Sequence, residues 1–110
     1  MPDLAARVSI IIPTLNAARH LPELLPKLKS QTLPPLEIIL VDSSSADDTR
    51  GIAARHGCRV EVIERSAFNH GGTRNRGASL TSGDILVCMT QDVLPADDTF
   101  LEELTRPVRE

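Results

Sequence analysis

Short runs of aliphatic residues alternate along the chain with stretches whose apolar residues recur at helical spacing. Four of these runs predict strands, at residues 8–12, 38–41, 59–64 and 85–89. Three are continuously apolar, which is typical of strands covered on both faces. The run at 59–64 alternates apolar and charged residues, which indicates a strand at an edge of the sheet. Pro13 follows the first run and is expected to end it, because proline lacks the N–H that a central ladder needs.

Helical patterns fill the intervals between the strands. Leucines recur three and four residues apart in the first interval, as on one face of a helix. Ser45-Ala46-Asp47-Asp48 has the spacing of a capping box, so Ser45 is expected to open the second helix, and Gly57 can supply the left-handed residue that ends it. The four expected helices span residues 17–28, 45–56, from Gly72 to about 82, and 96–105.

This order of four strands and four helices predicts an α/β fold, a mostly parallel Rossmann-like sheet of about four strands with helices on both faces. Right-handed crossovers would bring the carboxyl ends of the strands to one rim, where open α/β sheets bind ligands. Polar and glycine-rich segments follow the strands at that rim, at residues 13–16, 42–45, 68–75 and 90–92. The rim is therefore where a binding site is expected.

Length and charge limit the classes of function. The 110 residues predict one domain, residues 1–110, and the net charge of −3 gives no electrostatic footprint for nucleic acid. The longest apolar runs have about five residues, far fewer than the ~20 that span a membrane. Cys58 and Cys88 have neither a disulfide-framework nor a zinc spacing; they suit a soluble protein of the reducing cytoplasm, and both are expected to be buried.

Three side chains at the rim carry candidate chemistry, and each has a plainer alternative. Asp42 can accept hydrogen bonds from a base or ribose, or Asp42 and Ser45 only cap the next helix. Arg74 can meet a phosphate bidentately beside the flexible pair Gly71-Gly72, or the segment is a turn that enters a helix. Asp92 suits Mg²⁺ or Mn²⁺ bridging a diphosphate, or it is an ordinary loop residue.

Four segments in order resemble the signatures of inverting family-2 glycosyltransferases with the GT-A fold: residues 8–16, 37–49, 73–78 and 83–92. The chain departs from the usual pattern of this family at two places. Asp42-Ser43 stands where the family has a tandem Asp, and Thr90-Gln91-Asp92 stands where it has D-x-D. Both departures resemble a rhamnosyltransferase-like branch of the family. The resemblance implies the N-terminal, nucleotide-sugar-binding part of a longer glycosyltransferase. That enzyme would transfer a sugar, rhamnose in this branch, to an acceptor hydroxyl with inversion.

The resemblance also implies site residues and partners. The nucleotide-sugar-binding residues would be Pro13, Thr14, Asn16, Asp42, Ser43, Arg74 and Gln91, and Asp92 would hold a divalent cation, Mg²⁺ or Mn²⁺. The donor would be dTDP-rhamnose or a UDP-sugar, and the acceptor a saccharide or lipid-linked saccharide, with the full-length parent peripheral on the inner face of the membrane. The expected partners include no nucleic acid, and a second copy would pair through an exposed sheet edge.

The resemblance assigns no general base, because the family takes its base from a later Asp or Glu on the acceptor side. The 110 residues alone are therefore expected to bind a donor nucleotide without transferring a sugar. The alternative is a non-catalytic, glycosyltransferase-like interaction module.

Overall fold

The computed structural model describes residues 7–67 and 69–109. Four parallel strands form one sheet in the order β3-β2-β1-β4. The strands are β1 (Val8–Thr14), β2 (Glu37–Asp42), β3 (Arg59–Val62) and β4 (Ile85–Cys88). The predicted parallel α/β sheet is confirmed, and β3 lies at an edge as its alternating pattern indicated.

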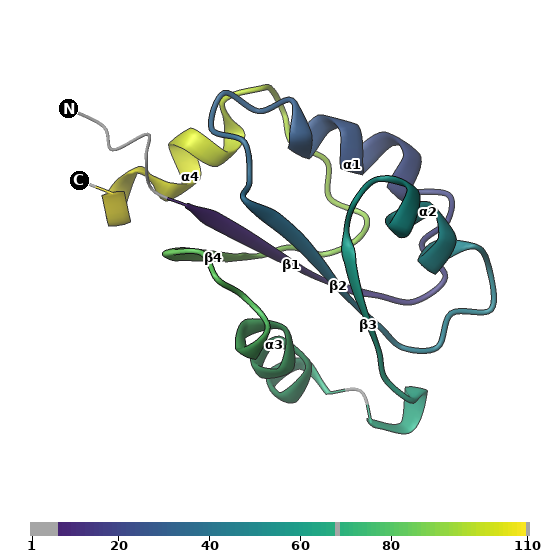
Figure 1. Cartoon of the computed structure of the whole chain (residues 1–110). Coiled ribbons are helices and arrows are strands. Elements are labelled where there is room, and N and C mark those ends of the chain that lie inside the picture. The colour runs from purple at the N-terminus through teal and green to yellow at the C-terminus, as the bar shows by residue number, and fades with distance from the viewer. Residues whose placement is uncertain (1–6, 68, 110) are drawn as a thin grey trace.

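Helices cover both faces of the sheet. They are α1 (Leu21–Lys29), α2 (Thr49–Arg55), α3 (His70–Ser79) and α4 (Phe100–Arg109), with a 3₁₀ turn, η1 (Arg65–Ala67), after β3. Figure 1 shows α1, α2 and α4 on one side of the sheet and α3 on the other. The expected layering is confirmed, although α4 begins later than the 96–105 expected from sequence.

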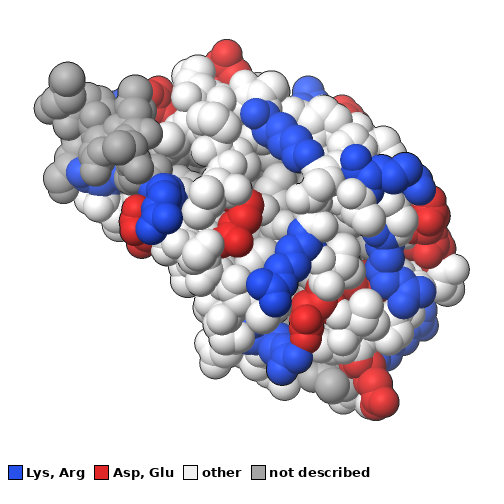
Figure 2. All heavy atoms as spheres, viewed as in Figure 1, with Lys and Arg blue, Asp and Glu red and all other residues white. Residues whose placement is uncertain are grey.

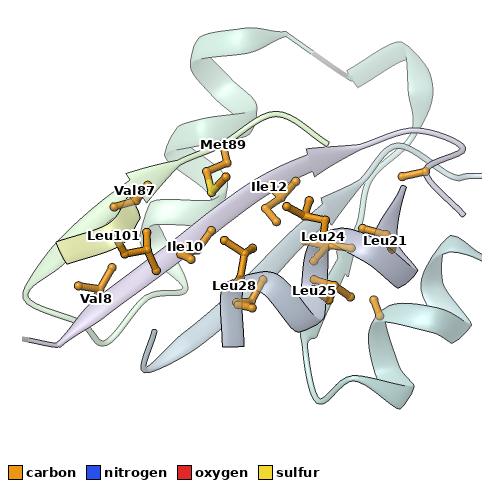
Figure 3. Packing of buried hydrophobic residues seen from close by; sticks show 14 of the residues in the cluster. Val8, Ile10, Ile12, Leu21, Leu24, Leu25, Leu28, Val87, Met89 and Leu101 are labelled. Carbon is orange, nitrogen blue, oxygen red and sulfur yellow. The ribbon is translucent and has the colours of Figure 1, made fainter. Parts of the chain in front are cut away.

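The main core lies between the sheet and the α1–α4 layer. Figure 3 shows Val8, Ile10 and Ile12 of β1 pointing toward the leucines of α1 and toward Leu101 of α4. These side chains are fully buried, and each such burial contributes about 1.5–3 kcal/mol. The alternate residue Ile11 faces α3, where Gly77 leaves room for its side chain. The central strand is therefore covered on both faces, as its continuous apolar run predicted.

Pro13 does not end the first strand, which continues to Thr14. The N–H of Met89 donates to the carbonyl of Ile11 (2.9 Å), so at Ile11 the β1 backbone faces β4. Backbone groups two residues apart along a strand face the same neighbour, so Pro13 also faces that side. The β1–β4 ladder already ends at Ile11 and Cys88, and the missing N–H of Pro13 therefore costs no ladder hydrogen bond.

The starts of all four helices differ from those predicted: α1 begins at Leu21 and α4 at Phe100, each four residues later than expected. Asp48, not Ser45, is the N-cap of α2, and its side chain makes no capping hydrogen bond. The first N–H of the helix, that of Thr49, donates instead to Oδ1 of Asp47 (3.0 Å). Helix α3 begins at His70, where Asn69 caps it by accepting a hydrogen bond from the N–H of Gly72 (2.6 Å). Gly71 and Gly72 therefore lie in a helical turn rather than in an open loop. Gly57 has φ of +75°, as predicted for the residue after α2.

Cys88 is exposed, contrary to expectation, because β4 lies at the second edge of the sheet. Cys58 is half-buried, and burial raises the pKa of its thiol. Phe68, in the predicted rim segment 68–75, lies outside the described residues.

Figure 2 shows basic and acidic side chains interspersed over the face that it displays. Within residues 7–67 and 69–109, no helix combines the length and the apolar content needed to cross a bilayer.

The close approach of α3 to β1 gives a stability prediction. In Gly77→Ala, the new Cβ would fall far inside van der Waals contact with Cγ2 of Ile11, so we expect a loss of about 1–3 kcal/mol in the free energy of unfolding. Gly71→Ala is the matched control, because its Cβ would meet nothing within 4 Å; helix propensity should raise stability by up to about 1 kcal/mol. Urea unfolding measures both. Equal stability of the two variants would contradict this packing.

Candidate functional site

The strand order places a topological switch point beside β1. The chain passes from β1 to β2 and β3 on one side, and β4 returns to the other side of β1. In open α/β sheets, ligands bind at the carboxyl ends of the strands where the order reverses. Here that place is the gap between the ends of β1 and β4, independently of any motif.

A hollow of about 460 Å³ occupies this place. Its volume lies in the range of small-molecule sites, roughly 300–1,000 Å³. It is lined by Pro13, Thr14, Leu15, Ser43, Arg65, Thr90 and Gln91. Four residues predicted to bind a nucleotide sugar therefore meet here although they come from three different strand ends.

A second hollow of about 360 Å³ adjoins the first. It is lined by Pro13, Arg74, Cys88, Met89 and Thr90, and it shares Pro13 and Thr90 with the first hollow. Arg74, a predicted site residue, reaches it from α3. Each hollow thus has an arginine on its wall, and guanidinium groups suit phosphate oxygens.

Asp42 lies beneath the first hollow and is fully buried. Its Oδ1 accepts hydrogen bonds from the hydroxyls of Thr14 (2.7 Å) and Ser45 (2.5 Å), and its Oδ2 accepts one from the N–H of Ser45 (2.9 Å). It does not cap α2, which begins at Thr49. The carboxylate instead fastens the end of β1 to the segment after β2.

Hydrogen bonds from its own backbone N–H groups hold the loop after β1, residues 15–18, against neighbouring segments. Four consecutive N–H groups donate to side chains of other segments: Leu15 to Gln91 Oε1 (2.8 Å), Asn16 to Ser45 Oγ (2.9 Å), Ala17 to Thr49 Oγ1 (2.8 Å) and Ala18 to Asp47 Oδ2 (3.1 Å). We call residues 15–18 the clamped loop. Three of the acceptors lie two residues apart, at positions 45, 47 and 49. The segment whose sequence resembles a capping box therefore holds the clamped loop in place.

The acceptors of the clamped loop are themselves fixed. The hydroxyl of Thr49 donates to Oδ1 of Asp47, as that of Ser45 does to Asp42. Desolvation raises the pKa of Asp47, but hydrogen bonds from Thr49 and from the Ala18 N–H outweigh it and hold the pKa below its usual 3.8. Asp47 therefore accepts as a carboxylate at neutral pH.

Asn16 has a structural partner within this arrangement. It adopts φ of +50°, a conformation that asparagine tolerates better than most residues. Its side-chain Oδ1 accepts a hydrogen bond from the N–H of Ala46 (2.8 Å). Asn16 is not among the residues that line the two hollows. It can therefore affect the predicted site only indirectly, by shaping the clamped loop.

The sequence matches the family described as "Glycosyl transferase family 2" over residues 9–110. The chain belongs to glycosyltransferase family 2. The family membership that the four segments indicated is thereby confirmed, and the fold is that of the GT-A glycosyltransferases.

Curated relatives of this family 2 chain include O-antigen rhamnosyltransferases. It is 42% identical over 98 residues to the O-antigen chain rhamnosyltransferase WbaN of Salmonella anatum, covering 87% of this chain and 31% of that protein. It is 36% identical over 102 residues to a PGL/p-HBAD biosynthesis glycosyltransferase of Mycobacterium bovis, covering 89% of this chain and 38% of that protein. The chain therefore spans about a third of the length of these relatives.

Solved glycosyltransferases share the fold. S. aureus TarS, residues 1–349, superposes with a TM-score of 0.78 at 25% identity, over 90% of this chain and 31% of that one. Glucosyl-3-phosphoglycerate synthase of Mycobacterium tuberculosis, crystallised with Mn²⁺, UDP and phosphoglyceric acid, also gives 0.78, at 26% identity, over 94% of this chain and 39% of that one.

Asp92 is the remaining predicted residue of this family 2 domain. It is exposed in the turn after β4 and is not among the residues lining either hollow. Across the described part of the chain, no three His, Cys, Asp or Glu residues gather as a metal site. A single carboxylate with phosphate oxygens and water is a usual Mg²⁺ arrangement, so Asp92 fits a cation held jointly with a diphosphate.

Sequence reasoning missed three residues of the first hollow: Leu15, Arg65 and Thr90. Arg65 lies between the predicted third strand and the predicted rim segment 68–75, so it follows a strand end on the same rim as the predicted residues. That position after a strand end was the available signal. The acceptors at positions 45, 47 and 49 carried no signal of their role, because their pattern is also that of a helix start.

The buried position of Asp42 gives the prediction for this site. Asp42→Ala leaves the hydroxyl donors and the Ser45 N–H without an acceptor, which should lower the free energy of unfolding by about 2–4 kcal/mol. Asp42→Asn keeps one oxygen, and the hydroxyls can turn to accept from its amide, so it should cost about half as much. Urea unfolding at neutral pH compares them. An alanine variant as stable as wild type would show that Asp42 does not hold the strand ends together.

Proposed function

We propose that residues 1–110 form a single donor-binding domain, the N-terminal part of a glycosyltransferase of its relatives' size. The full protein transfers a sugar from a nucleotide sugar to an acceptor hydroxyl with inversion, and rhamnose is the sugar that we propose. The observation that carries this proposal is the hollow at the switch point, where Pro13, Thr14 and Ser43 meet.

The geometry supports a definite placement of the donor. The base and ribose lie against the ends of β1 and β2, where the Ser43 hydroxyl offers a donor and an acceptor. The buried carboxylate of Asp42 supports this wall, because it accepts hydrogen bonds from the hydroxyls of Thr14 and Ser45. The diphosphate extends past Thr90 toward Arg65 and Arg74, the arginines of the two hollows.

A divalent cation, Mg²⁺ or Mn²⁺, fits this scheme only together with the donor. Asp92 supplies one carboxylate oxygen and the diphosphate supplies others, so the cation binds when nucleotide is present. When bound, it offsets the negative charge that develops on the leaving diphosphate. Mn²⁺ accompanies GDP-Man in the solved mannosyltransferase of Pyrobaculum calidifontis, which shares this fold with a TM-score of 0.75 at 26% identity.

The transfer itself needs groups beyond this donor site. An acceptor hydroxyl attacks the anomeric carbon opposite the departing nucleoside diphosphate, and a general base takes its proton. We assign no residue of this chain as that base. The acceptor is a saccharide or lipid-linked saccharide, and the reaction takes place in the cytoplasm, with the full protein peripheral on the inner face of the membrane. The 110 residues alone are proposed to bind the donor without transfer.

The rhamnosyl donor is favoured by the relatives. The two O-antigen rhamnosyltransferases, WbaN and RfbN, are 42% and 36% identical to this chain over nearly nine-tenths of its length. The donor is therefore dTDP-rhamnose, and a UDP-sugar is the alternative, because UDP and UDP-GlcNAc accompany solved TarS.

A second candidate is a glycosyltransferase-like module without catalysis. One observation favours it: in the turn Thr90-Gln91-Asp92 only Asp92 carries a carboxylate, and the amide oxygen of Gln91 already accepts from the Leu15 N–H. Such a module would bind its partner without any nucleotide. Nucleotide affinity therefore separates the two functions.

Calorimetric titration with dTDP and UDP, with and without Mn²⁺, tests the donor site. We expect binding of at least one nucleotide, strengthened by Mn²⁺, and no Mn²⁺ binding without nucleotide. Arg65→Ala should weaken binding about tenfold, because it removes a charged hydrogen bond to phosphate. The matched control is Arg55→Ala, an exposed arginine paired with Asp48 outside both hollows, which should bind as wild type does. No heat with either nucleotide would refute the donor site and favour the non-catalytic module.

We also propose a homodimer through the β4 edge. Strand β4 is an edge strand that exposes Leu86, and the exposed side chains of Leu104 and Val108 line a hollow beside it. Sedimentation should show a dimer that forms with rising concentration and that Leu104→Glu abolishes. Leu36→Glu, at a similarly exposed leucine away from β4, should leave it intact. A wild-type chain that stays monomeric throughout the series would argue against this interface.

A further inference from the structure

The side-chain amide of Gln91 makes a two-point contact with one backbone residue across the switch point. Its Oε1 accepts from the N–H of Leu15 (2.8 Å), and its Nε2 donates to the carbonyl of the same residue (3.1 Å). Of the four side chains that hold the clamped loop, three belong to the segment after β2, and only Gln91 comes from the β4 side. This contact therefore joins the two strand ends that border the hollow.

The contact also determines what Gln91 can offer a ligand. Its amide oxygen and one amide hydrogen already bond to the Leu15 backbone, and Gln91 also lines the first hollow. A group tied in this way sets the shape of the site more directly than it binds a phosphate.

We propose that Gln91 is a positioning residue of the donor site, which fixes the separation between the ends of β1 and β4 and thereby the width of the hollow. This inference rests on the proposed function, because the site it shapes is the donor site. It differs from the role implied by the family resemblance, in which Gln91 is itself a nucleotide-sugar-binding residue.

The chemistry of the contact requires an amide. A carboxylate at position 91 can accept from the Leu15 N–H, but it has no hydrogen for the Leu15 carbonyl and would place negative charge against that oxygen. A protonated carboxyl group has both an acceptor and a donor, so it can restore the two-point contact. Gln91→Glu should therefore behave as a pH-dependent version of the same clamp, and Gln91→Met should lose both hydrogen bonds while keeping a similar length.

The first test measures amide hydrogen exchange at Leu15 by NMR without any nucleotide. The Leu15 N–H should exchange about fivefold to tenfold faster in Gln91→Met, the change expected when one ordinary hydrogen bond is lost. Thr90→Ala is the control, because it alters the same hollow but leaves the two hydrogen bonds between Gln91 and Leu15 in place, and it should leave this rate within twofold of wild type. A Leu15 rate in Gln91→Met within twofold of wild type would overturn the clamp.

The second test separates positioning from mere stabilisation of the fold. The affinity for dTDP or UDP, whichever wild type binds, is measured for each variant under conditions where unfolding curves show it fully folded. Gln91→Met should bind about tenfold more weakly. Gln91→Glu should be similarly weak at pH 7 and approach wild type near pH 3.5, where a glutamate with the ordinary pKa of about 4.3 is largely protonated. Each variant is compared with wild type at the same pH, which removes the effect of phosphate titration.

The outcomes distinguish the inference from the function on which it rests. Wild type that binds no nucleotide overturns the proposed function and the positioning role with it, whatever the exchange rates show. Wild-type binding with unchanged affinity in folded Gln91→Met overturns the positioning role alone. Weak binding by Gln91→Met with an unchanged Leu15 exchange rate would mean that Gln91 contacts the nucleotide directly, and it would likewise overturn the inference.

Discussion

Four consecutive backbone N–H groups follow β1, and a loop that leaves a central strand cannot satisfy them by itself. In this chain each of them donates to a side chain from a neighbouring segment, three after β2 and one after β4. The loop is therefore fixed relative to both strands that flank β1. The shape of the hollow depends on this arrangement, because its lining includes Thr14 and Leu15 from the end of β1, Ser43 from the end of β2 and Gln91 from the end of β4.

This constraint explains why the family motif after β2 carries so many small oxygen-bearing side chains. Asp42 is buried and collects Thr14 and Ser45, while Ser45 and Thr49 pass hydrogen bonds on to the clamped loop. The segment that the family resemblance assigns to donor binding is thus largely occupied with holding the rim of the hollow in place. Ser43 and Arg65 line the first hollow and Arg74 lines the second, so the proposed contacts with the nucleotide and its phosphates are assigned to these side chains.

Much of the fold could be predicted from sequence because strand and helix periods are local signals. The strands, their parallel orientation and the polar rim were predictable because strand and helix patterns alternate along the chain. The family was predictable from four motifs in order. The roles of Ser45 and Gln91 could not be predicted, because each depends on a partner about 30 or 76 positions away. Cys88 was misplaced for a related reason: its exposure depends on which strand lies at the edge, and strand order is a property of long-range pairing.

A crystal structure of the chain with dTDP or UDP tests the central claim most directly. The account predicts the nucleotide in the hollow, against Pro13 and Ser43, with residues 15–18 unmoved and still bonded to Ser45, Asp47, Thr49 and Gln91. A nucleotide seated on another surface, or a loop that leaves these four side chains to admit it, would contradict the view that a clamped β1 loop builds the donor site.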